Sequence, residues 1–410
     1  MIRFGLMLLF LVTANTAVGQ DNCLDCHLEL EEDAALAMAE DVHAQAGISC
    51  ADCHGGDPTV EIVDDDYELA MDPDKGFIGI PEVRDIPEMC GRCHGDAAFM
   101  RQYDPNISVD QLDQYWTSVH GRKLREGATD VAQCASCHHA HGVLSAKDPR
   151  SPVYPTRIPE TCGACHADAD YMKNYGIPTD QLSEYRKSVH GRALFDDGDL
   201  GAPTCNSCHG NHGAAPPGLA SVSSVCGSCH SVQKELFVRS PHKEAFDALD
   251  EPECETCHGN HDVQAPTDDL VGVGDDAICM GCHDEGEPAY NVAKTMNEEM
   301  TSLRGAMAAA REVINLAARA GMEVSEGDLA LIDANQALVE SRNLVHGLAV
   351  EPLQEKIKEG LAVTEEAEQI GFAALAELDY RRKGLAASVF FILVLVAGLY
   401  LKIRQIEARE

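Results

Sequence analysis

Cysteine and histidine recur together along this chain in one pattern, Cys-x-x-Cys-His. All 18 cysteines fall into such motifs, so that none is left over. Two thiols three residues apart can bond to the two vinyl groups of one haem, and the adjoining histidine then becomes the proximal ligand of the iron. The pattern therefore predicts nine covalently bound haems of the c type. The predicted attachment and proximal-ligand residues are Cys23, Cys26 and His27; Cys50, Cys53 and His54; Cys90, Cys93 and His94; Cys134, Cys137 and His138; Cys162, Cys165 and His166; Cys205, Cys208 and His209; Cys226, Cys229 and His230; Cys254, Cys257 and His258; and Cys279, Cys282 and His283.

Three other uses of paired cysteines fit this pattern less well. Zinc ribbons need pairs of Cys-x-x-Cys motifs, and nine is an odd number. Disulfide frameworks suit an exported chain with an even number of cysteines, but they do not place histidine after every second cysteine. Thioredoxin-like redox pairs occur once per domain on a βαβ frame, which this sequence does not show.

The chain also repeats internally around further histidines. The phrase Ile-Pro-Glu begins at Ile86 and again at Ile158, and both repeats continue to Ser-Val-His-Gly-Arg. Shorter versions of that phrase are Ser-Pro-His and Asp-Val-His. Three motifs carry a further histidine three residues after their own, which is expected to serve a neighbouring haem. As neutral imidazoles these residues are predicted distal iron ligands: His43, His120, His190 and His242 in the phrase, and His141, His212 and His261 at the +3 position.

Two histidines fit the repeat less simply. His139 follows His138 directly and matches nothing in the other units. His346 lies in the C-terminal region within Val-His-Gly and is predicted to be a ligand, since the last motif has no lone histidine after it. The +3 histidine is missing after His54. Eight predicted distal histidines are thus available for nine irons. Either His139 or a methionine is the ninth distal ligand, or one haem iron has no distal ligand.

Composition points to a fold built around cofactors. The net charge of −37 excludes nucleic acid as a default partner, because the necessary excess of Lys and Arg is missing. Ten Phe and one Trp are too few for a conventional core in the cysteine-rich region, which is rich in Gly, Pro and Asp. We therefore expect a mainly α fold with extensive loops around the haems. The acidic run Asp64–Asp66 is interpreted as a solvated loop, or alternatively as a patch for a basic partner.

The remaining segments predict export and a membrane anchor. Residues 1–19 have the basic start, short apolar stretch and small residues of a signal peptide. Residues 20–288 form the predicted nonahaem domain, and residues 289–384 a helical hairpin and stalk with apolar residues at helical spacing. Residues 385–401 carry no charge and are predicted to span the membrane. Residues 402–410 would be a cytoplasmic tail, with the haem domain on the periplasmic side of the inner membrane.

The motifs and the Ser-Val-His-Gly phrases resemble exported multihaem c-type cytochromes, the broad group that includes tetrahaem cytochromes and octahaem cytochromes related to hydroxylamine oxidoreductase. The resemblance covers residues 23–283. It implies closely stacked haems along which electrons hop. No Cys-x-x-Cys-Lys motif is present, which disfavours the pentahaem nitrite reductases.

The favoured function is respiratory electron transfer between a membrane partner, either a quinol-oxidising subunit or a cytochrome, and a soluble periplasmic or extracellular redox partner. The alternative is a reductase or oxidase of a small nitrogen or sulfur compound at one five-coordinate haem.

Overall fold

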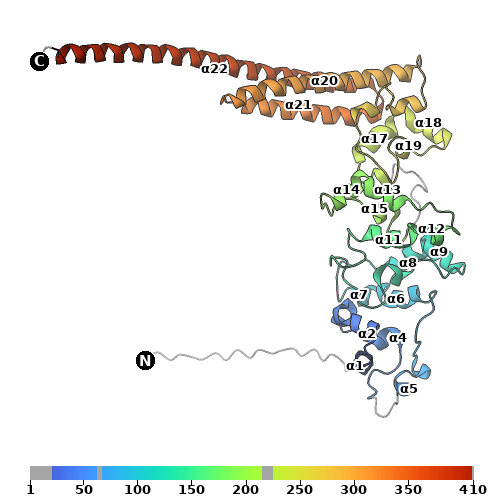
Figure 1. Ribbon diagram of the computed structural model, residues 1–410. Helices are drawn as coiled ribbons and strands as arrows, with labels where there is room; N and C mark the ends of the chain where they lie inside the picture. The colour runs from blue at the N-terminus through green and yellow to red at the C-terminus, as the bar shows by residue number, and fades with distance from the viewer. Residues whose placement is uncertain (1–20, 62–66, 215–224, 409–410) are drawn as a thin grey trace, which may run out of the picture. The chain divides into compact units, whose positions relative to one another are not determined.

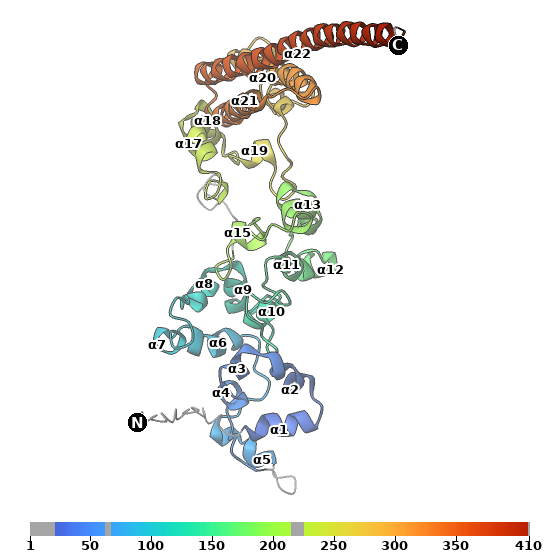
Figure 2. The same ribbon diagram turned by 90° about the vertical axis from the view of Figure 1, so that its left-hand side faces the viewer.

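The computed structural model describes residues 21–61, 67–214 and 225–408, and its regular elements are helices (Figures 1 and 2). No strand occurs within these described ranges. The prediction of a mainly α fold with extensive loops is thereby confirmed. The predicted signal peptide and the acidic run Asp64–Asp66 lie outside the described residues.

The chain divides into two compact units. The first comprises Met1–Pro217 and His261–Val263. Its helices are short and joined by long loops, as Gly, Pro and Asp between the motifs would favour. They are α1 (Asn22–Glu29), α2 (Asp33–Ala37), η1 (Met38–Glu40), α3 (Val42–Gln45), α4 (Cys50–His54), α5 (Tyr67–Ala70), η2 (Pro73–Lys75), α6 (Ile86–His94), α7 (Ala97–Met100), α8 (Gln111–Thr117), α9 (Val119–Arg125), α10 (Cys134–His138), α11 (Ile158–His166), α12 (Ala169–Met172), α13 (Gln181–Lys187), α14 (Val189–Phe195) and α15 (Cys205–His209).

The second unit comprises Gly218–Asn260 and Gln264–Glu410. It contains the last three cysteine motifs and the long C-terminal helices. Its helices are α17 (Ser231–Arg239), α18 (Pro241–Leu249), α19 (Glu255–His258), η3 (Asp268–Leu270), η4 (Ile278–Gly281), α20 (Pro288–Arg319), α21 (Ser325–Leu344), η5 (Val345–Gly347) and α22 (Val350–Glu407).

The long helices form a three-helix bundle, in which the first part of α22 runs beside α20 and α21 (Figures 1 and 2). Helical spacing of apolar residues brings one stripe of each helix into a common core. Met296, Met300 and Leu303 of α20 pack with Leu338 of α21 and with Leu353 and Ile357 of α22. A second cluster, around Ile314, Leu331 and Ala367, continues the core toward the hairpin between α20 and α21.

The sequence Ser-Glu-Gly-Asp from Ser325 to Asp328 has the pattern of a capping box, in which Ser325 would be the N-cap, but α21 begins differently. Ser325 is the first helical residue, and the N-cap position is occupied by Val324. The amide of Ser325 instead donates to the Glu323 carboxylate, 3.0 Å away. The N-cap thus lies one residue earlier than the serine pattern indicates, and the Glu323 carboxylate accepts from the otherwise free amide of the first helical residue.

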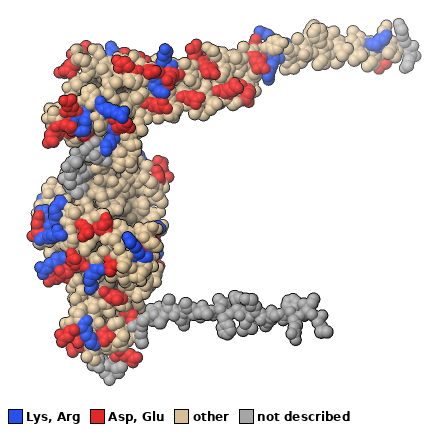
Figure 3. Space-filling view, turned by 180° about the vertical axis from the view of Figure 1, so that it is seen from behind, with Lys and Arg blue, Asp and Glu red and all other residues tan. Residues whose placement is uncertain are grey.

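One described helix, α22, is long and apolar enough to cross a membrane, and its most apolar window is unburied. Residues 385–401 form the apolar stretch, and basic residues precede and follow it, so that Figure 3 shows an uncharged surface between two charged patches. Exposed Leu, Ile, Val and Phe side chains along a helix are stable in lipid and costly in water. This stretch of α22 could therefore serve as a membrane anchor.

Candidate functional site

Most of the Cys-x-x-Cys-His motifs form or end a short helix. In α4, α10 and α15 the motif itself is the helix, whereas α6 and α11 begin four residues earlier at Ile-Pro-Glu. Proline suits the first turn because its missing amide hydrogen would have no partner there. Residues three and four apart share one helix face, so both thiols and the imidazole point the same way. The cysteines form no disulfide: all 18 are free.

Among the described residues, seven imidazole pairs have ring centroids separated by nearly constant distances. Each pair joins a motif histidine to a histidine outside the motifs. The distances between ring centroids are 6.0 Å for His43 and His94, 6.0 Å for His54 and His141, 6.1 Å for His120 and His166, 6.2 Å for His138 and His212, 6.0 Å for His209 and His261, 6.0 Å for His242 and His283, and 6.1 Å for His258 and His346.

This spacing fits one iron atom between the rings. Metal–imidazole bonds of about 2.0 Å on both sides of one ion place the ring centroids roughly 6 Å apart. Zinc fits less well, since it needs four ligands around one point, and no group of three or more His, Cys, Asp or Glu residues with that arrangement occurs among the described residues. Each of these sites has two thiols, which would bond to the porphyrin, and two imidazoles, which would bind the iron, as a c-type haem with two histidine ligands requires.

Burial favours the neutral, iron-binding form of nine of these imidazoles. It lowers the pKa of His94, and the nearby His43 lowers it further, because two facing cations would repel each other. Burial is likewise the largest cause of a lowered pKa at His120, His138, His141, His166, His212, His242, His258 and His346.

The +3 histidines face earlier motifs rather than their own. His141, three residues after His138, faces His54, and His212 in turn faces His138. The C-terminal region also contributes a histidine, but not to the last motif. His346 faces His258, while the last motif's His283 faces His242. Which histidine meets which motif depends on the path of the chain, and the order of residues in the sequence does not give it.

The Ser-Val-His-Gly phrase fixes each distal histidine at the start of a helix. Ser118 is fully buried, and its hydroxyl accepts a hydrogen bond from the Gly121 amide (2.9 Å) while donating to the Tyr115 carbonyl (2.6 Å). A Cβ on Gly121 would lie 2.1 Å from that carbonyl oxygen, so only glycine fits. Ser188 and Gly191 repeat the arrangement around His190. The phrase is thus a capped and closely packed turn that positions an imidazole.

A buried tyrosine connects each of these turns to the following motif. The Tyr115 hydroxyl donates to the Ala132 carbonyl (3.0 Å), two residues before Cys134. The Tyr185 hydroxyl donates to the Pro203 carbonyl (2.8 Å), two residues before Cys205. Burial raises the pKa of both phenols to about 12, so they remain donors. The repeated Asp-Gln-Leu-x-x-Tyr phrase shows these residues in the sequence, but its role appears only in the fold.

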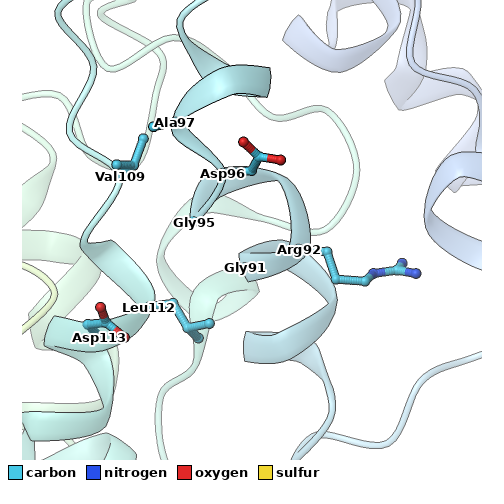
Figure 4. A pocket seen from close by; sticks show the side chains of 8 residues that line it. All are labelled: Gly91, Arg92, Gly95, Asp96, Ala97, Val109, Leu112 and Asp113. Carbon is cyan, nitrogen blue, oxygen red and sulfur yellow. The ribbon is translucent and has the colours of Figure 1, made fainter.

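Glycine inside two motifs allows the next helix to pack closely. A Cβ on Gly91 would lie 2.4 Å from Leu112 of α8, and one on Gly163 would lie 2.4 Å from Leu182 of α13. Figure 4 shows Leu112 beside Gly91, with Arg92 pointing away from it. This packing sets the position of the distal-histidine turn that follows each of these helices.

Long-range backbone hydrogen bonds hold the +3 histidines near these turns. The Val42 amide donates to the Val143 carbonyl (2.9 Å), two residues after His141. Val119 makes the same bond to Ala214 (3.0 Å), two residues after His212, and Val189 makes it to Val263 (2.8 Å), two residues after His261. Each turn that presents one distal histidine therefore also anchors the loop that presents another.

Consecutive motifs are neighbours within each unit. The Cys90 thiol donates a hydrogen bond to Cys134, which raises the pKa of Cys90 and lowers that of Cys134. The same contact joins Cys162 with Cys205, and Cys254 with Cys226. Charge effects on thiol pKa values also connect Cys50 with Cys23, Cys53 with Cys90, Cys137 with Cys165, and Cys257 with Cys279. These thiols would hold haems at neighbouring positions along the chain.

The remaining predicted ligands are placed as follows. His190 lies on α14, at the position that His120 has on α9, and His230 precedes α17.

The imidazole of His27 contacts the Glu32 carboxylate (2.8 Å), and no second imidazole faces it among the described residues. His139 is exposed and occupies a left-handed position at the end of α10 (φ 67°), where α4 and α15 have glycine. His139 therefore ends a helix and faces no motif histidine.

Comparison with known proteins agrees with this chemistry. Residues 42–167 match the model of the cytochrome c3 family, and residues 10–55 and 225–307 match that of cytochrome c554 and c-prime. No curated protein and no solved structure matches the chain. The two family matches together include eight of the nine motifs, all but Cys205–His209. Together with the facing imidazoles they indicate that this chain is a multihaem c-type cytochrome.

Proposed function

We propose that the chain is a membrane-anchored relay that passes electrons through nine covalently bound haems during respiration. The observation that carries this proposal is the set of seven facing imidazole pairs, each 6.0–6.2 Å apart and each at its own cysteine motif. An iron with imidazole on both faces has no site left for a substrate and is suited to exchanging one electron at a time. The protein's own contribution is spacing, ligation and potential.

The order of the thiol contacts supports a relay along the chain. In the first unit they connect each motif with the next, from Cys23 to Cys205, and in the second from Cys226 to Cys279. Neighbouring attachment points keep successive electron-transfer steps short.

The predicted signal peptide and the unburied apolar stretch of α22 support a location on the periplasmic side of the inner membrane. One helix is too little to form a quinone site by itself. A membrane subunit that oxidises quinol, or another cytochrome, is therefore the proposed donor, and a soluble redox protein the proposed acceptor.

A direct test begins with the number of haems. Intact mass of the mature full chain should exceed the polypeptide mass by nine haems, and the ferrous pyridine spectrum should give the same ratio. A mass equal to that of the bare polypeptide, or one showing cysteine–cysteine bonds, would refute the proposal.

Relay is tested by removing one haem from the middle or from the end. Cys134→Ser with Cys137→Ser removes the fourth attachment site, whereas Cys23→Ser with Cys26→Ser removes the first and serves as the matched control. The fully reduced proteins are mixed with less than one equivalent of a soluble one-electron oxidant. We expect electrons to redistribute more slowly only after loss of the middle site, because the chain of contacts is then interrupted. Equal redistribution in both variants would contradict a linear relay.

A second function is favoured by one observation, the absence of a facing imidazole at His27 among the described residues. An iron at this site would have a face open to a small nitrogen or sulfur compound. Binding of carbon monoxide or nitrite, together with a high-spin signal from about one iron in nine, would support this enzyme activity. Loss of that signal in the Cys23→Ser, Cys26→Ser variant would assign it to His27.

A further inference from the structure

The residue that caps the distal-histidine turn is serine in three of its four versions and aspartate in the fourth. Ser118, Ser188 and Ser240 precede the short helices that carry His120, His190 and His242. Asp41 occupies this position before His43, as the N-cap of α3. A neutral hydroxyl at three sites is therefore replaced by a carboxylate at one.

Asp41 is buried and hydrogen-bonded on both of its carboxylate oxygens. Its exposed fraction is 1%. Oδ1 accepts from the His43 amide (2.7 Å) and lies 3.1 Å from His43 Nδ1, while Oδ2 accepts from the Val143 amide (2.7 Å). When His43 binds iron through Nε2, its Nδ1 carries the hydrogen and donates to Asp41. Ser118 makes no such contact, because its hydroxyl binds the Gly121 amide and the Tyr115 carbonyl.

Other carboxylates beside predicted ligand imidazoles are more exposed than Asp41. Glu32 beside His27, Glu287 beside His283 and Glu184 beside His261 have side chains 50%, 49% and 35% exposed, so solvent screens their charge. The charge of Asp41 is screened much less. A negative charge held near an iron favours the ferric state over the ferrous state, because reduction removes one positive charge from the site.

The ring planes at this site also differ from those of the other pairs. His43 and His94 lie at 86° to each other. The other six described pairs lie between 8° and 54°. A hydrogen bond on Nδ1 fixes the rotation of a ligand ring. Asp41 therefore places a carboxylate beside His43 and holds the Nδ1 side of its ring by a hydrogen bond.

We propose that Asp41 is a positioning residue that lowers the reduction potential of the iron held by His43 and His94 below that of the serine-capped sites. This inference rests on the proposed function, since it requires iron between these two imidazoles. An electron on the haem of the third motif, that of His94, would then have a higher energy than an electron on the haems of the serine-capped sites.

The test is a redox titration of the full-chain holoprotein followed by electron paramagnetic resonance. Near-perpendicular axial rings give a strongly anisotropic low-spin ferric signal, which separates this iron from the others. Asp41→Asn removes the charge and keeps Oδ1 as an acceptor for His43, although it leaves the Val143 amide without a partner. Asp41→Ser installs the residue of the other turns. Ser118→Asp, at the turn of His120, is the reciprocal variant.

In Asp41→Asn we expect the anisotropic signal to persist and to titrate at a more positive potential. A tenfold shift of its ferric-to-ferrous ratio at fixed potential corresponds to about 59 mV for one electron. In Asp41→Ser we expect the same positive shift together with reduced anisotropy, because the ring is released. Ser118→Asp should move a different signal to more negative potential.

An unchanged titration of the anisotropic signal in both Asp41 variants would overturn the inference while leaving the relay intact. Equal shifts of all the irons would also overturn it, since a general loosening of the fold would act everywhere. Failure of the proposed function is distinguishable: without haem the wild-type protein would show no low-spin signal, and without a relay the middle-site and end-site variants would redistribute electrons equally.

Discussion

The cysteine-rich region and the C-terminal bundle solve the problem of a stable interior in different ways. Among the described residues, ten apolar side chains are buried across residues 21–283, whereas seventeen are buried across the much shorter stretch 288–374. The first region packs small groups of helices around places where two imidazoles and two thiols converge. The bundle packs leucine, isoleucine and methionine side chains against one another. One region depends on a cofactor for its interior, and the other is complete in its own side chains.

Preventing haem attachment should produce the largest difference between the two regions, because only the cysteine-rich region needs haem to fold. Without porphyrins, residues 21–283 bury too little apolar surface to offset the entropy of ordering the chain. We expect limited proteolysis of chain produced without haem attachment to degrade this region and to leave a fragment covering residues 288–384. The holoprotein is the control. A protected cysteine-rich region in the absence of haem would show that the comparison is wrong.

A cavity in the C-terminal bundle should destabilise the bundle and leave the cysteine-rich region unchanged. Leu303 is fully buried among Met300, Leu338 and Leu353. Leu303→Ala should lower the free energy of unfolding of the bundle by about 2–5 kcal/mol. Leu316, 58% exposed on the same helix, provides the control, and Leu316→Ala should change it by less than about 0.5 kcal/mol. Thermal unfolding followed by helical circular dichroism measures both effects, and the haem spectrum should not change.

A methyl group in a distal-histidine turn should disturb one haem site locally. Gly121→Ala places a Cβ against the Tyr115 carbonyl, so the turn must shift and move His120 away from His166. We expect a high-spin ferric signal from one iron, with the bundle unaffected. Gly281 lies inside a motif and has open space around its Cα, so Gly281→Ala is the matched control. A low-spin spectrum in both variants would contradict the role assigned to Gly121.

The smallest effect should be a dependence of bundle stability on acid pH. The hydrogen bond from Arg342 lowers the pKa of Asp268 below its usual value, and the charges of Arg342 and Arg304 add to this. The stabilisation is complete above the unfolded pKa of about 3.9 and is lost as pH falls through the lower native pKa. Asp268→Asn should therefore unfold in less urea than wild type at neutral pH, and the difference should shrink in acid. A constant difference would argue against this ion pair.

The sequence predicts the Cys-x-x-Cys-His sites and the helices well, because both depend on residues that are close together in the sequence. Eight apolar residues of α20 are spaced by three and four, and seven of them are buried, because a period of 3.6 residues alone defines that face. The eight are Ala293, Met296, Met300, Leu303, Met307, Ala310, Ile314 and Ala317, of which Met307 is partly exposed. The bundle itself is less predictable: a hairpin and a stalk are expected, whereas α22 packs along both partners. Its apolar positions show that it is amphipathic but not which helix it meets.

The pairing of histidines could not be read from the sequence, because it depends on contacts between distant segments. His346 and His258 are brought together by the packing of the second unit, in which Gln233 of α17 binds Asn343 of α21 (2.8 Å). The roles of the residues that position the distal histidines also cannot be predicted from the sequence. Tyr115 and Gly121 are visible as parts of a repeated phrase, but their roles follow from a carbonyl position that only the fold supplies.

The direction of the long-range ligand contacts has a consequence for biogenesis. A motif such as that of His54 meets its second imidazole only when His141 follows, and the motif of His258 waits for His346 at the end of α21. In a chain that is made from its N-terminus onward, a haem at either motif would lack its second imidazole until the later segment had been added. The end of α21 would then complete the ligand set of an earlier motif, so that biogenesis of the haem region would depend on the bundle.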